Sequence, residues 1–379
     1  MRIRIVGGGP AGLYLAYLLA RQGRQRGVRH EIELIEQNPP GATFGFGVVF
    51  SDQALGFLQE DDSETHDLIA PEMERWRDLA LNHPSGERVV IDGIGFAAIG
   101  RHRLLELLAR RLESVGVAPR WETRIAPESV LHGADLVVGA DGVNSVVRQA
   151  ADFGTEIRPL DNRFAWFGAQ IPFDALTQTF VETERGTFNA HHYRFTPERS
   201  TFIVEADPAT FEAYGFEGMD EAASAELCAE IFAEVLEGRP LLTNKSHWRR
   251  FPRLSNARWS AGAAVLIGDA LRTAHFSIGS GTRLALEDAI ALAQAIGETG
   301  EDVPAALALF EERRRPIVAK LVEAANRSAA WYEDFPEHIK LPPYDFAWSY
   351  ISRSGRVDPD RLAKIAPEFV AAYRERAGA

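Results

Sequence analysis

The first forty residues alternate between two kinds of apolar periodicity. Met1–Val6 alternates apolar and polar residues as a strand does, and LYLAYLLARQG, which starts at Leu13, repeats its apolar residues at helical spacing. His30–Glu36 alternates again, and glycines fill the gap between the first strand and the helix. The pattern therefore predicts a strand, a glycine turn, a helix and a second strand.

Separate helical and β-like blocks follow along the chain. Arg101–Glu113 has the leucine spacing of an amphipathic helix, and Asp135–Ala140 and Ala263–Ile267 are apolar runs typical of buried parallel strands. Two-residue periodicity and many aromatic residues predict antiparallel strands from Phe164 to Ala206. Further helices are predicted at Asp220–Leu236, Thr282–Ile296 and Val303–Trp331, the last kinked at Pro316.

The β/α blocks at both ends of the chain flank a β-rich middle. We therefore predict an α/β protein whose nucleotide-binding domain is built from discontinuous pieces, with a β-rich substrate domain inserted between them. The predicted nucleotide-binding pieces are residues 1–75, 99–155 and 259–335, the substrate domain comprises residues 76–98 and 156–258, and residues 336–379 form a C-terminal cap.

Composition and charge exclude several classes of protein. The 379 residues are 46% hydrophobic and 25% charged, as in an ordinary globular protein. A formal net charge of −13 argues against binding to nucleic acid or to an anionic membrane surface, because both favour an excess of Lys and Arg. It leaves room for an anionic small molecule held by a local basic patch.

Single residues and short segments narrow the class further. One cysteine, Cys228, excludes an internal disulfide framework and is interpreted as a small buried side chain on a helix, and the ten histidines show no metal-ligand spacing. No segment is long and apolar enough for a membrane span. Arg2 and Arg4 could begin a signal peptide, but the glycines that follow form a nucleotide turn, so we expect a cytoplasmic protein. For its oligomeric state we expect a monomer or a homodimer. The acidic stretch Glu60–Asp67 is interpreted as a solvated surface segment.

The glycine turn carries a chemical prediction. Gly7, Gly9 and Gly12 have the G-x-G-x-x-G spacing of a dinucleotide-binding unit, in which the first glycine permits a tight turn, the second a close approach to pyrophosphate and the third close helix packing. Glu36 ends the second strand, where the ribose hydroxyls of such a ligand lie. The alternative is a glycine-rich turn with no ligand.

Two later segments have the same strand-to-turn character. DLVVGADGVNSVVR places Asp141 and Gly142 after a buried strand, and GDALRTAHFSIGSGTRLALED places Asp269 after another and opens a helix with Gly279 and Gly281. Either segment alone is compatible with an ordinary strand-to-helix turn. Together with the first turn, and with Arg101 at the head of a helix, the set resembles the single-component FAD-dependent aromatic hydroxylases of the para-hydroxybenzoate hydroxylase type, over nearly the whole chain.

The resemblance implies a Rossmann-like FAD-binding domain with an inserted β-rich substrate domain. It implies that the glycine turn holds the FAD pyrophosphate, that Glu36 meets the adenosine ribose, and that Asp269 meets the ribityl or ribose hydroxyls. Arg101 reaches the phosphate–ribose region, and Asp141–Gly142 form the motif shared between FAD and NAD(P)H binding. The implied cofactor-binding residues are Gly7, Gly9, Pro10, Ala11, Gly12, Glu36, Gln37, Arg101, Asp141, Gly142, Asp269, Gly279, Ser280, Gly281 and Thr282.

Departures from the usual motif narrow the family. Arg272, Phe276 and Arg283 stand where a histidine, a proline and an asparagine are usual. The strings FGFGVVFS, TAHFSIGSGTRLALEDAIAL and FAWSYISRSGRV are similar to the hydroxylases of aryl-CoA thioesters, such as salicylyl-CoA 5-hydroxylase, which forms gentisyl-CoA. A tryptophan hydroxylase of pigment biosynthesis resembles the chain more distantly. The chain ends without a second catalytic domain, so no reductase activity on the ring is expected.

The implied activity is hydroxylation of an activated aromatic ring. In this class NAD(P)H reduces the flavin, O₂ adds at flavin carbon C4a, and the resulting hydroperoxide transfers oxygen to the ring. No metal and no protein nucleophile are required. The alternatives are a hydroxylase of a tryptophan-like, indole-type or free aromatic substrate, a flavin oxidase or reductase with the same FAD motifs, and a non-catalytic flavin-binding protein.

Residues expected near the ring follow from the same motifs. His275 is placed beside the flavin, where it could bond a substrate phenol or thioester carbonyl, and Phe276, Phe46 and Val48 are expected as apolar walls. Only one of the adjacent His191 and His192 can face a pocket, because neighbours on a strand point to opposite faces. For each of these a purely structural role is the alternative. The candidate catalytic residues are His275, Phe276 and Val48. The candidate substrate-binding residues are Phe46, His192, Arg249 and Arg250, the two arginines for CoA phosphates, with Arg253 and Arg313–Arg315 as further candidates.

Overall fold

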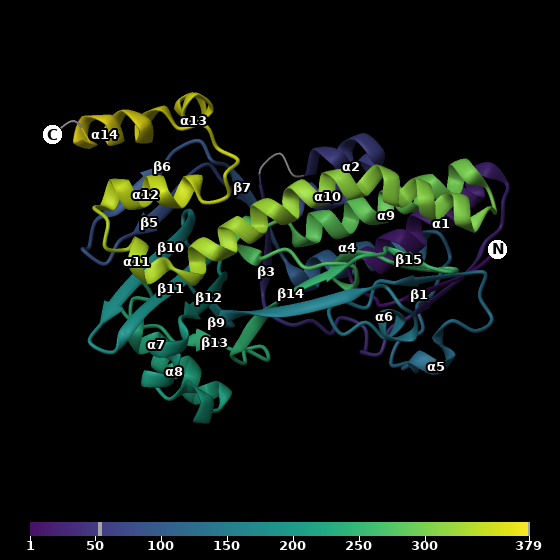
Figure 1. The fold of residues 1–379 in the computed structure, drawn as a ribbon, viewed down its shortest axis with the longest axis horizontal. Helices are drawn as coiled ribbons and strands as arrows, with labels where there is room; N and C mark the ends of the chain where they lie inside the picture. The colour runs from purple at the N-terminus through teal and green to yellow at the C-terminus, as the bar shows by residue number, and fades with distance from the viewer. Residues whose placement is uncertain (52–54, 378–379) are drawn as a thin grey trace.

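A computed structural model describes residues 1–51 and 55–377. A five-stranded sheet forms one half of the molecule, at the N-terminal end in Figure 1, in the order β15-β16-β8-β1-β2. β1, β2, β8 and β16 run parallel, and β15 pairs antiparallel to β16. The strands are β1 (Arg2–Val6), β2 (Glu31–Ile35), β8 (Leu136–Gly139), β15 (Ser260–Ala261) and β16 (Ala264–Leu266). The predicted parallel strands at both ends of the chain therefore meet in one sheet.

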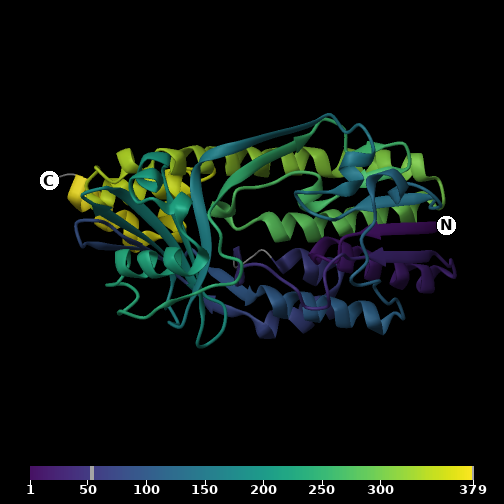
Figure 2. The ribbon, with the colours of Figure 1, turned by 90° about the horizontal axis from the view of Figure 1, so that it is seen from below.

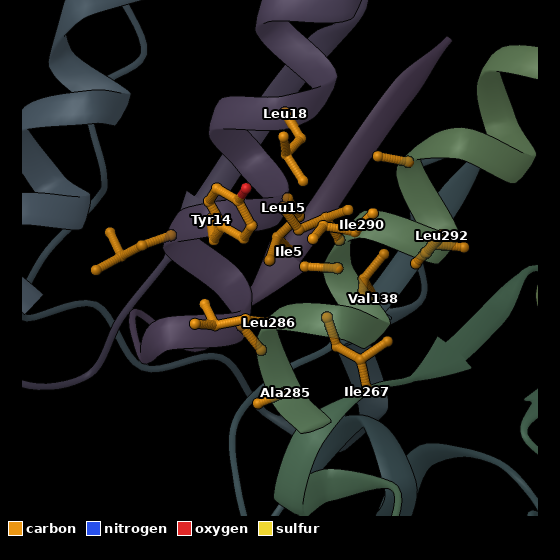
Figure 3. Packing of buried hydrophobic residues seen from close by; sticks show 14 of the residues in the cluster. Ile5, Tyr14, Leu15, Leu18, Val138, Ile267, Ala285, Leu286, Ile290 and Leu292 are labelled. Carbon is orange, nitrogen blue, oxygen red and sulfur yellow. The ribbon is translucent and has the colours of Figure 1, made fainter. Parts of the chain in front are cut away.

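Long helices cover this sheet. They are α1 (Pro10–Arg26), α4 (Arg101–Ser114), α9 (Gly281–Thr299) and α10 (Val303–Glu333). Figure 3 shows the apolar core between α1, α9 and the strands, where Leu15 and Ile290 lie close to Ile5 and Val138. α10 continues through Pro316 as one helix.

An eight-stranded sheet forms the other half, in the order β13-β9-β12-β11-β10-β5-β6, with β14 paired to β9. β9 to β12 are antiparallel neighbours or near neighbours, as the two-residue periodicity predicts, and β5 joins β10 in parallel. The strands are β5 (Leu79–Asn82), β6 (Arg88–Ile91), β9 (Thr155–Ala169), β10 (Leu176–Thr183), β11 (Gly186–Arg194), β12 (Ser200–Ala206), β13 (Leu241–Leu242) and β14 (Arg249–Asn256).

Smaller elements join and cover the two sheets. β3, β7 and β4 form a three-stranded sheet in that order. The remaining elements are β3 (Gly47–Ser51), β4 (Glu74–Trp76), β7 (Phe96–Gly100), α2 (Gly56–Asp61), α3 (Ser63–Ile69), α5 (Pro127–Val130), α6 (Val146–Ala150), α7 (Pro208–Ala213), α8 (Glu221–Ile231), α11 (Phe335–His338), α12 (Pro343–Ser352), α13 (Pro359–Ile365), α14 (Pro367–Ala377) and four 3-10 turns, Ala70–Glu72, Phe216–Gly218, Gly268–Ala270 and Phe276–Ile278.

A two-stranded ribbon and one long helix connect the halves. The paired strands β9 and β14 run together from one half to the other, and α10 crosses most of the length of the molecule (Figures 1 and 2). The sequence pattern missed β14 and the first part of β9, which begins at Thr155 rather than Phe164. The missed residues alternate charged side chains along an exposed ribbon, so they carry little apolar signal.

The C-terminal residues form helices α11 to α14. Phe346 of α12 and Phe369 of α14 belong to the apolar cluster that also contains Leu79 and Ile91 of β5 and β6. The predicted domain boundaries remain a proposal; the strands of the five-stranded sheet come from its three predicted nucleotide-binding pieces.

Two local interpretations are corrected. The acidic stretch Glu60–Asp67 is not simply solvated, because Asp62 is 3% exposed and accepts hydrogen bonds from Arg21 at 2.6 Å and from the Tyr14 hydroxyl at 3.2 Å. The helix predicted to reach Leu236 ends at Ile231. Cys228 is confirmed as a buried residue of α8.

Candidate functional site

The candidate site begins where three parallel strands end at one edge of the five-stranded sheet. The turn Gly7–Gly9 follows β1, Asp141–Gly142 follow β8, and Gly268–Asp269 follow β16. Carboxyl ends of parallel strands form the ligand crevice of open α/β sheets. All of these turns line one large cavity of about 1680 Å³, except that Gly8 is not among its lining residues.

The glycine turn has the geometry that its spacing predicts. Gly7 has φ +108°, and a Cβ on it would clash with the carbonyl oxygen of Ala140 in the neighbouring turn. Around a Cβ on Gly9, by contrast, no atom lies within 4 Å, so this backbone faces open space at the N-terminus of α1. Pro10 and Ala11 line the same space.

Gly12 has a different role from the other two glycines. It does not line the cavity, and a Cβ on it would clash with the carbonyl oxygen of Gly7. Gly12 therefore permits close packing of α1 against the turn, which is the role that the glycine spacing predicts for it.

Glu36 lies at the end of β2, on the rim of the cavity beside Gln37. Its carboxylate accepts hydrogen bonds from the backbone N–H of Gly8 at 2.7 Å and of Asn38 at 2.8 Å. These bonds fix the carboxylate next to the glycine turn. A ribose hydroxyl arriving there would find an oriented acceptor.

Asp141 presents an unsatisfied oxygen. Its Oδ2 accepts a hydrogen bond from the backbone N–H of Val146 at 2.6 Å, whereas its buried Oδ1 has no partner among the described residues. Burial raises the pKa of Asp141 above its usual range, and hydrogen bonds to the carboxylate partly offset this rise. A buried acceptor without a partner is costly, so a ligand hydroxyl or water is expected at Oδ1.

Arg101 and Asp269 both line the cavity and carry opposite charges that interact. Arg101 is the first residue of α4, lines the cavity, and shows no side-chain hydrogen bond within the described part of the chain. Burial lowers the pKa of Arg101, an effect that Asp269 opposes. Burial likewise raises the pKa of Asp269, and Arg272 and Arg101 oppose it. A long-range attraction therefore links a cation and an anion that both remain available to a ligand.

The turn before α9 completes the lining. Gly279 has φ +60° and lies against Val49 of β3, and α9 begins at Gly281, so the free amides of its first turn face the cavity together with Ser280 and Thr282. Val48, the neighbour of Val49 on β3, also lines the cavity. This turn offers amide donors to an electron-rich ring edge.

These residues fit FAD. The open space at Gly9, the helix N-termini of α1 and α9, the orphaned Oδ1 of Asp141 and the available guanidinium of Arg101 provide donors for phosphates and acceptors for sugar hydroxyls along one cavity. The cavity volume of about 1680 Å³ exceeds the 300–1,000 Å³ of an ordinary ligand pocket, which leaves room for a second ligand beside the first.

The far end of the cavity is a wall made by the eight-stranded sheet. Gln178, His191, Ile203 and Trp166 are register partners on β10, β11, β12 and β9, and all four line the cavity. The rings of Phe164 and Phe276 lie 5.0 Å apart beside them, centroid to centroid. The wall is therefore aromatic, with a few fixed polar groups, as expected for binding of an arene.

His191 belongs to this wall and also to a chain of buried polar groups that extends away from the cavity. Gln178 Nε2 lies 3.0 Å from His191 Nδ1, and His191 Nε2 lies 3.7 Å from Glu205 Oε2. Asn162 donates to the other carboxyl oxygen of Glu205 at 3.0 Å. Burial lowers the pKa of His191 to about 3 and raises the pKa of Glu205 to about 8, so both groups are neutral at pH 7 and form no ion pair.

Glu205 gives a testable pH dependence. The pKa of its carboxyl is about 4.3 in the unfolded chain and about 8 in the folded protein. Between these two pH values the unfolded state has released the proton that the folded state keeps. Rising pH therefore lowers the free energy of unfolding across this window. Glu205→Gln removes the effect while keeping a side-chain oxygen for Asn162, so the variant should gain on the wild type by up to about 1.4 kcal/mol per pH unit.

Chemical unfolding of both proteins at several pH values from about 5 to 8 measures this difference. Glu182→Gln, on an exposed position of β10 in the same sheet, is the matched control and should show no such trend. A constant difference between Glu205→Gln and wild type over the window would mean that Glu205 is already ionised in the folded protein.

The structure places three of the expected ring-side residues outside the lining of the cavity. His192 points to the opposite face of β11, where its ring packs on Phe202 at 5.2 Å and its Nε2 bonds Thr179 at 2.8 Å, so His191 takes the cavity position. Phe46 does not line the cavity; its ring lies against Gly168 and Phe195.

His275, the third of these residues, lies directly behind the lining, with its ring centroid 4.2 Å from that of Phe276. Its Nδ1 lies 2.8 Å from the Ser277 hydroxyl and caps the turn Phe276–Ile278. Burial lowers the pKa of His275 to about 3, which keeps the ring neutral. His275 is thus a residue that positions the turn, and Phe276 beside it does line the cavity, as expected.

The candidate arginines divide into two groups. Arg249 and Arg250 line the cavity where β14 begins, whereas Arg253 and Arg313–Arg315 do not. Arg314 is buried against Asp288 at 3.2 Å, and Arg313 and Arg315 bind glutamates on α9 and α10. These three arginines stabilise the helices rather than meet a ligand.

Sequence reasoning missed several lining residues. Trp166, Gln178, Tyr350 and Arg353 all line the cavity, and none was assigned a role, although Tyr350 and Arg353 lie in the string FAWSYISRSGRV that carries part of the family resemblance. Trp166 and Gln178 follow the two-residue periodicity of their strands, which gives a common face but not the face that borders the cavity. Arg353 comes from the C-terminal helices, whose position no local pattern predicts.

Two family models match the chain. That of an FAD binding domain matches residues 96–325, and that of an NAD(P)-binding Rossmann-like domain matches residues 5–43. Salicyloyl-CoA 5-hydroxylase from a Streptomyces species is 37% identical over 366 residues, which cover 93% of this chain and 70% of that protein. The 3-hydroxy-4-methyl-anthranilyl-[aryl-carrier protein] 5-monooxygenase of Streptosporangium sibiricum is 40% identical over 89% of this chain and 90% of that protein.

Solved structures share the fold. 2-Methyl-3-hydroxypyridine-5-carboxylic acid oxygenase superposes with a TM-score of 0.71 at 19% identity, covering 96% of this chain and 95% of that one. PqsL, a probable FAD-dependent monooxygenase from Pseudomonas aeruginosa, gives a TM-score of 0.68 at 23% identity, covering 93% and 99%.

The chain is therefore a flavoprotein of the Rossmann-like class. More narrowly, it belongs to the FAD-dependent aromatic hydroxylases of the para-hydroxybenzoate hydroxylase type, and it is an aromatic monooxygenase that uses FAD, with NAD(P)H and O₂ as co-substrates. Its substrate is a small aromatic molecule. No helix among the described residues is long and apolar enough to cross a membrane.

Proposed function

We propose that this enzyme hydroxylates an aromatic ring that carries a hydroxyl or amino group and is held as a thioester, with salicylyl-CoA, hydroxylated at ring carbon 5 to gentisyl-CoA, as the first candidate. The observation that carries the proposal is that two relatives, 37% and 40% identical, are named for aryl thioester substrates, one on CoA and one on a carrier protein. A ring of this kind is rich enough in electrons for attack by an electrophilic oxygen.

The polar groups at the aromatic wall are one cation and a neutral histidine. Arg353 donates to Ser328 Oγ at 3.0 Å, to the Tyr350 carbonyl at 2.6 Å and to the Ser277 carbonyl at 2.9 Å, and it keeps its positive charge because all three acceptors are neutral. His191 is neutral at pH 7 because burial lowers its pKa. A thioester carbonyl is uncharged, so it can be buried here with hydrogen bonds alone, without a counter-charge.

Uncharged polar groups remain for that carbonyl and for the ring substituent. The buried Nε1 of Trp166 has no hydrogen-bond partner among the described residues, and it belongs to a residue that lines the cavity. Gln178 and Tyr350 bring further polar groups to the same lining. These donors orient the ring, and the walls of Phe164 and Phe276 exclude water from it.

The cofactor supplies the oxygen-transfer chemistry when bound, and the chain's own residues place the two reactants. The turn Gly279–Thr282 and the wall residues His191 and Phe276 line one continuous cavity. A flavin ring against that turn and an arene against that wall would therefore be neighbours. No protein side chain need act as a nucleophile.

The proposal predicts a sharp distinction between salicylyl-CoA and free salicylate. With the FAD-loaded enzyme, salicylyl-CoA should stimulate NAD(P)H oxidation and yield a product one oxygen atom heavier, and free salicylate should do neither above the background rate. Product mass and the rate of NAD(P)H oxidation are the measurements. Equal turnover of the free acid would refute the thioester requirement.

The same assay should include an aryl thioester carried by a 4′-phosphopantetheine group on a carrier protein, because the relative at 40% identity is named for such a substrate. Turnover of the carrier-bound ring together with none of the CoA ester would keep the aromatic thioester and change its carrier.

A further inference from the structure

Exposed residues of α10, of the segment that links α12 to α13, and of α13 are among those that line the cavity. In Figure 1 this segment lies on the side of α10 nearer its C-terminal end. Two contacts confirm that the two elements touch: Arg353 Nε donates to Ser328 Oγ at 3.0 Å, and a Cβ on Gly355 would lie 3.1 Å from Arg327 Nε. The residues of this rim that line the cavity include Ile317, Lys320, Arg353, Arg356, Arg361 and Ile365.

Three cations of this rim are unused. Lys320, Arg356 and Arg361 are exposed, and none of their side chains forms an ion pair or hydrogen bond within residues 1–51 and 55–377. The carboxylate of Asp358 is the N-cap of α13: it accepts a hydrogen bond from the backbone N–H of Arg361. In a chain with a net charge of −13, three free cations at one cavity mouth create a local field that attracts anions.

The cations at the β14 end of the cavity are already engaged. Arg250 pairs with Asp161 at 2.6 Å, and Arg249 donates to the backbone carbonyl of Lys245 at 3.0 Å. The ammonium of Lys245 lies 4.4 Å from the centre of the Phe44 ring. An incoming phosphate would have to displace these partners. The rim that carries Lys320, Arg356 and Arg361, called the α10 rim below, has three cations with no such partner among the described residues.

The α10 rim also connects directly to the ring end. The guanidinium of Arg353 lies 3.8 Å from the centre of the Tyr350 ring and donates to the Ser277 carbonyl, next to Phe276. Ile317 and Ile365, which are 50% and 38% exposed, stand at the same mouth. A ligand entering here meets charge and apolar surface outside and the aromatic wall inside.

We propose that Lys320, Arg356 and Arg361 bind the phosphate groups of the CoA part of the substrate, and that the α10 rim is the substrate entrance. The inference rests on the proposed function and replaces the expectation that Arg249 and Arg250 meet those phosphates. The pantetheine arm then passes Ile317, Ile365 and Arg353, and the thioester reaches the ring end. Arg353 is a positioning residue at the neck of this path.

The test compares wild type, the double variant Arg356→Glu/Arg361→Glu, and the matched control Lys364→Glu. Lys364 lies on the same helix, α13, is exposed, and does not line the cavity. On the FAD-loaded enzyme, isothermal titration with free coenzyme A gives the dissociation constant, and steady-state assays with salicylyl-CoA give KM and kcat. Unchanged thermal unfolding and flavin absorbance confirm that the variants are folded.

Two exposed phosphate contacts, each worth a few-fold in affinity and now turned into repulsion, should together raise both the dissociation constant and KM about tenfold or more. The value of kcat at saturating substrate should stay unchanged, because the lost contacts are remote from the reacting atoms. Lys364→Glu should match wild type. Dephospho-CoA and 4′-phosphopantetheine, titrated in parallel, show which phosphate the rim holds.

Several outcomes would overturn the site. If wild type binds coenzyme A and the double variant binds it equally, the rim is wrong, and a raised KM in Arg250→Glu would return the phosphates to the β14 end. If only the KM for NADPH rises, the rim serves the nicotinamide cofactor. If wild type neither binds coenzyme A nor turns over salicylyl-CoA, both the proposed function and the rim site fail, which distinguishes that result from failure of the rim alone.

Discussion

Gly9→Asp should give a folded protein that purifies without flavin and has no monooxygenase activity. The backbone of Gly9 faces open space in the cavity at the N-terminus of α1, with no atom within 4 Å of the position of a Cβ. An aspartate there meets no steric obstacle in the fold, so the fold is retained. Its carboxylate, however, occupies and charges the space in which the N-terminus of α1 would hold a pyrophosphate.

The visible absorbance of the purified variant, before and after incubation with FAD, measures this effect. Gly218→Asp is the matched control, because Gly218 also has open space around its Cβ position and lies on the exposed surface far from the turn in sequence. The control should stay yellow with full flavin content. A yellow, active Gly9→Asp variant would mean that the pyrophosphate is not bound at this turn.

Asp288→Ala should lower the free energy of unfolding by about 3–5 kcal/mol, the cost of removing one partner from a buried charge cluster. Asp288 is 0% exposed, and its carboxylate pairs with Arg272 at 2.7 Å and with Arg314 at 3.2 Å. It also accepts a hydrogen bond from the backbone N–H of Gly268 at 3.1 Å. Its loss would remove the ion-pair partner of the buried Arg272 guanidinium, leave Arg314 with Glu287 alone at 2.9 Å, and free the turn that presents Asp269.

Denaturant unfolding of the variant measures the loss, and the flavin content should fall with it because Gly268 and Asp269 line the cavity. Glu298→Ala provides the contrast, since it breaks an exposed ion pair with Arg313 and should change stability far less. Similar losses in the two variants would show that burial does not strengthen the dependence on Asp288.

The sequence predicts the cofactor half of the site well because its signals are local. The turn after β1 needs Gly7 for a positive φ and Gly12 for contact with the Gly7 carbonyl, and both requirements lie within six residues of one another. Strand, turn and helix are adjacent in the chain, so their geometry follows from their spacing. The same applies to Asp141 and to Gly279, which follow or precede a regular element directly.

The ring half of the site depends on packing between distant segments. Which of His191 and His192 faces the cavity is decided by the side of the eight-stranded sheet on which α10 and the turn at Phe276 lie, and strand periodicity carries no information about that side. Likewise, Arg353 reaches the cavity only because α12 folds back beside Ser328 of α10.

A run of charged residues does not show which of its cations are available to a ligand, for the same reason. Arg313 to Arg315 form a conspicuous run, yet each is engaged by an acidic partner on a neighbouring turn or helix. Lys320, Arg356 and Arg361 are scattered singly along the chain and meet at one rim through the fold. Availability of a cation is a property of its neighbours in space.

The most direct test of the account is a single turnover mixture of FAD-loaded enzyme, NAD(P)H and salicylyl-CoA under isotopically labelled O₂, analysed by product mass. We predict a hydroxylated CoA thioester in which the new oxygen atom carries the label. A product whose new oxygen comes from water, or consumption of NAD(P)H that yields only hydrogen peroxide, would contradict the claim that this cavity brings a flavin and an aromatic thioester together.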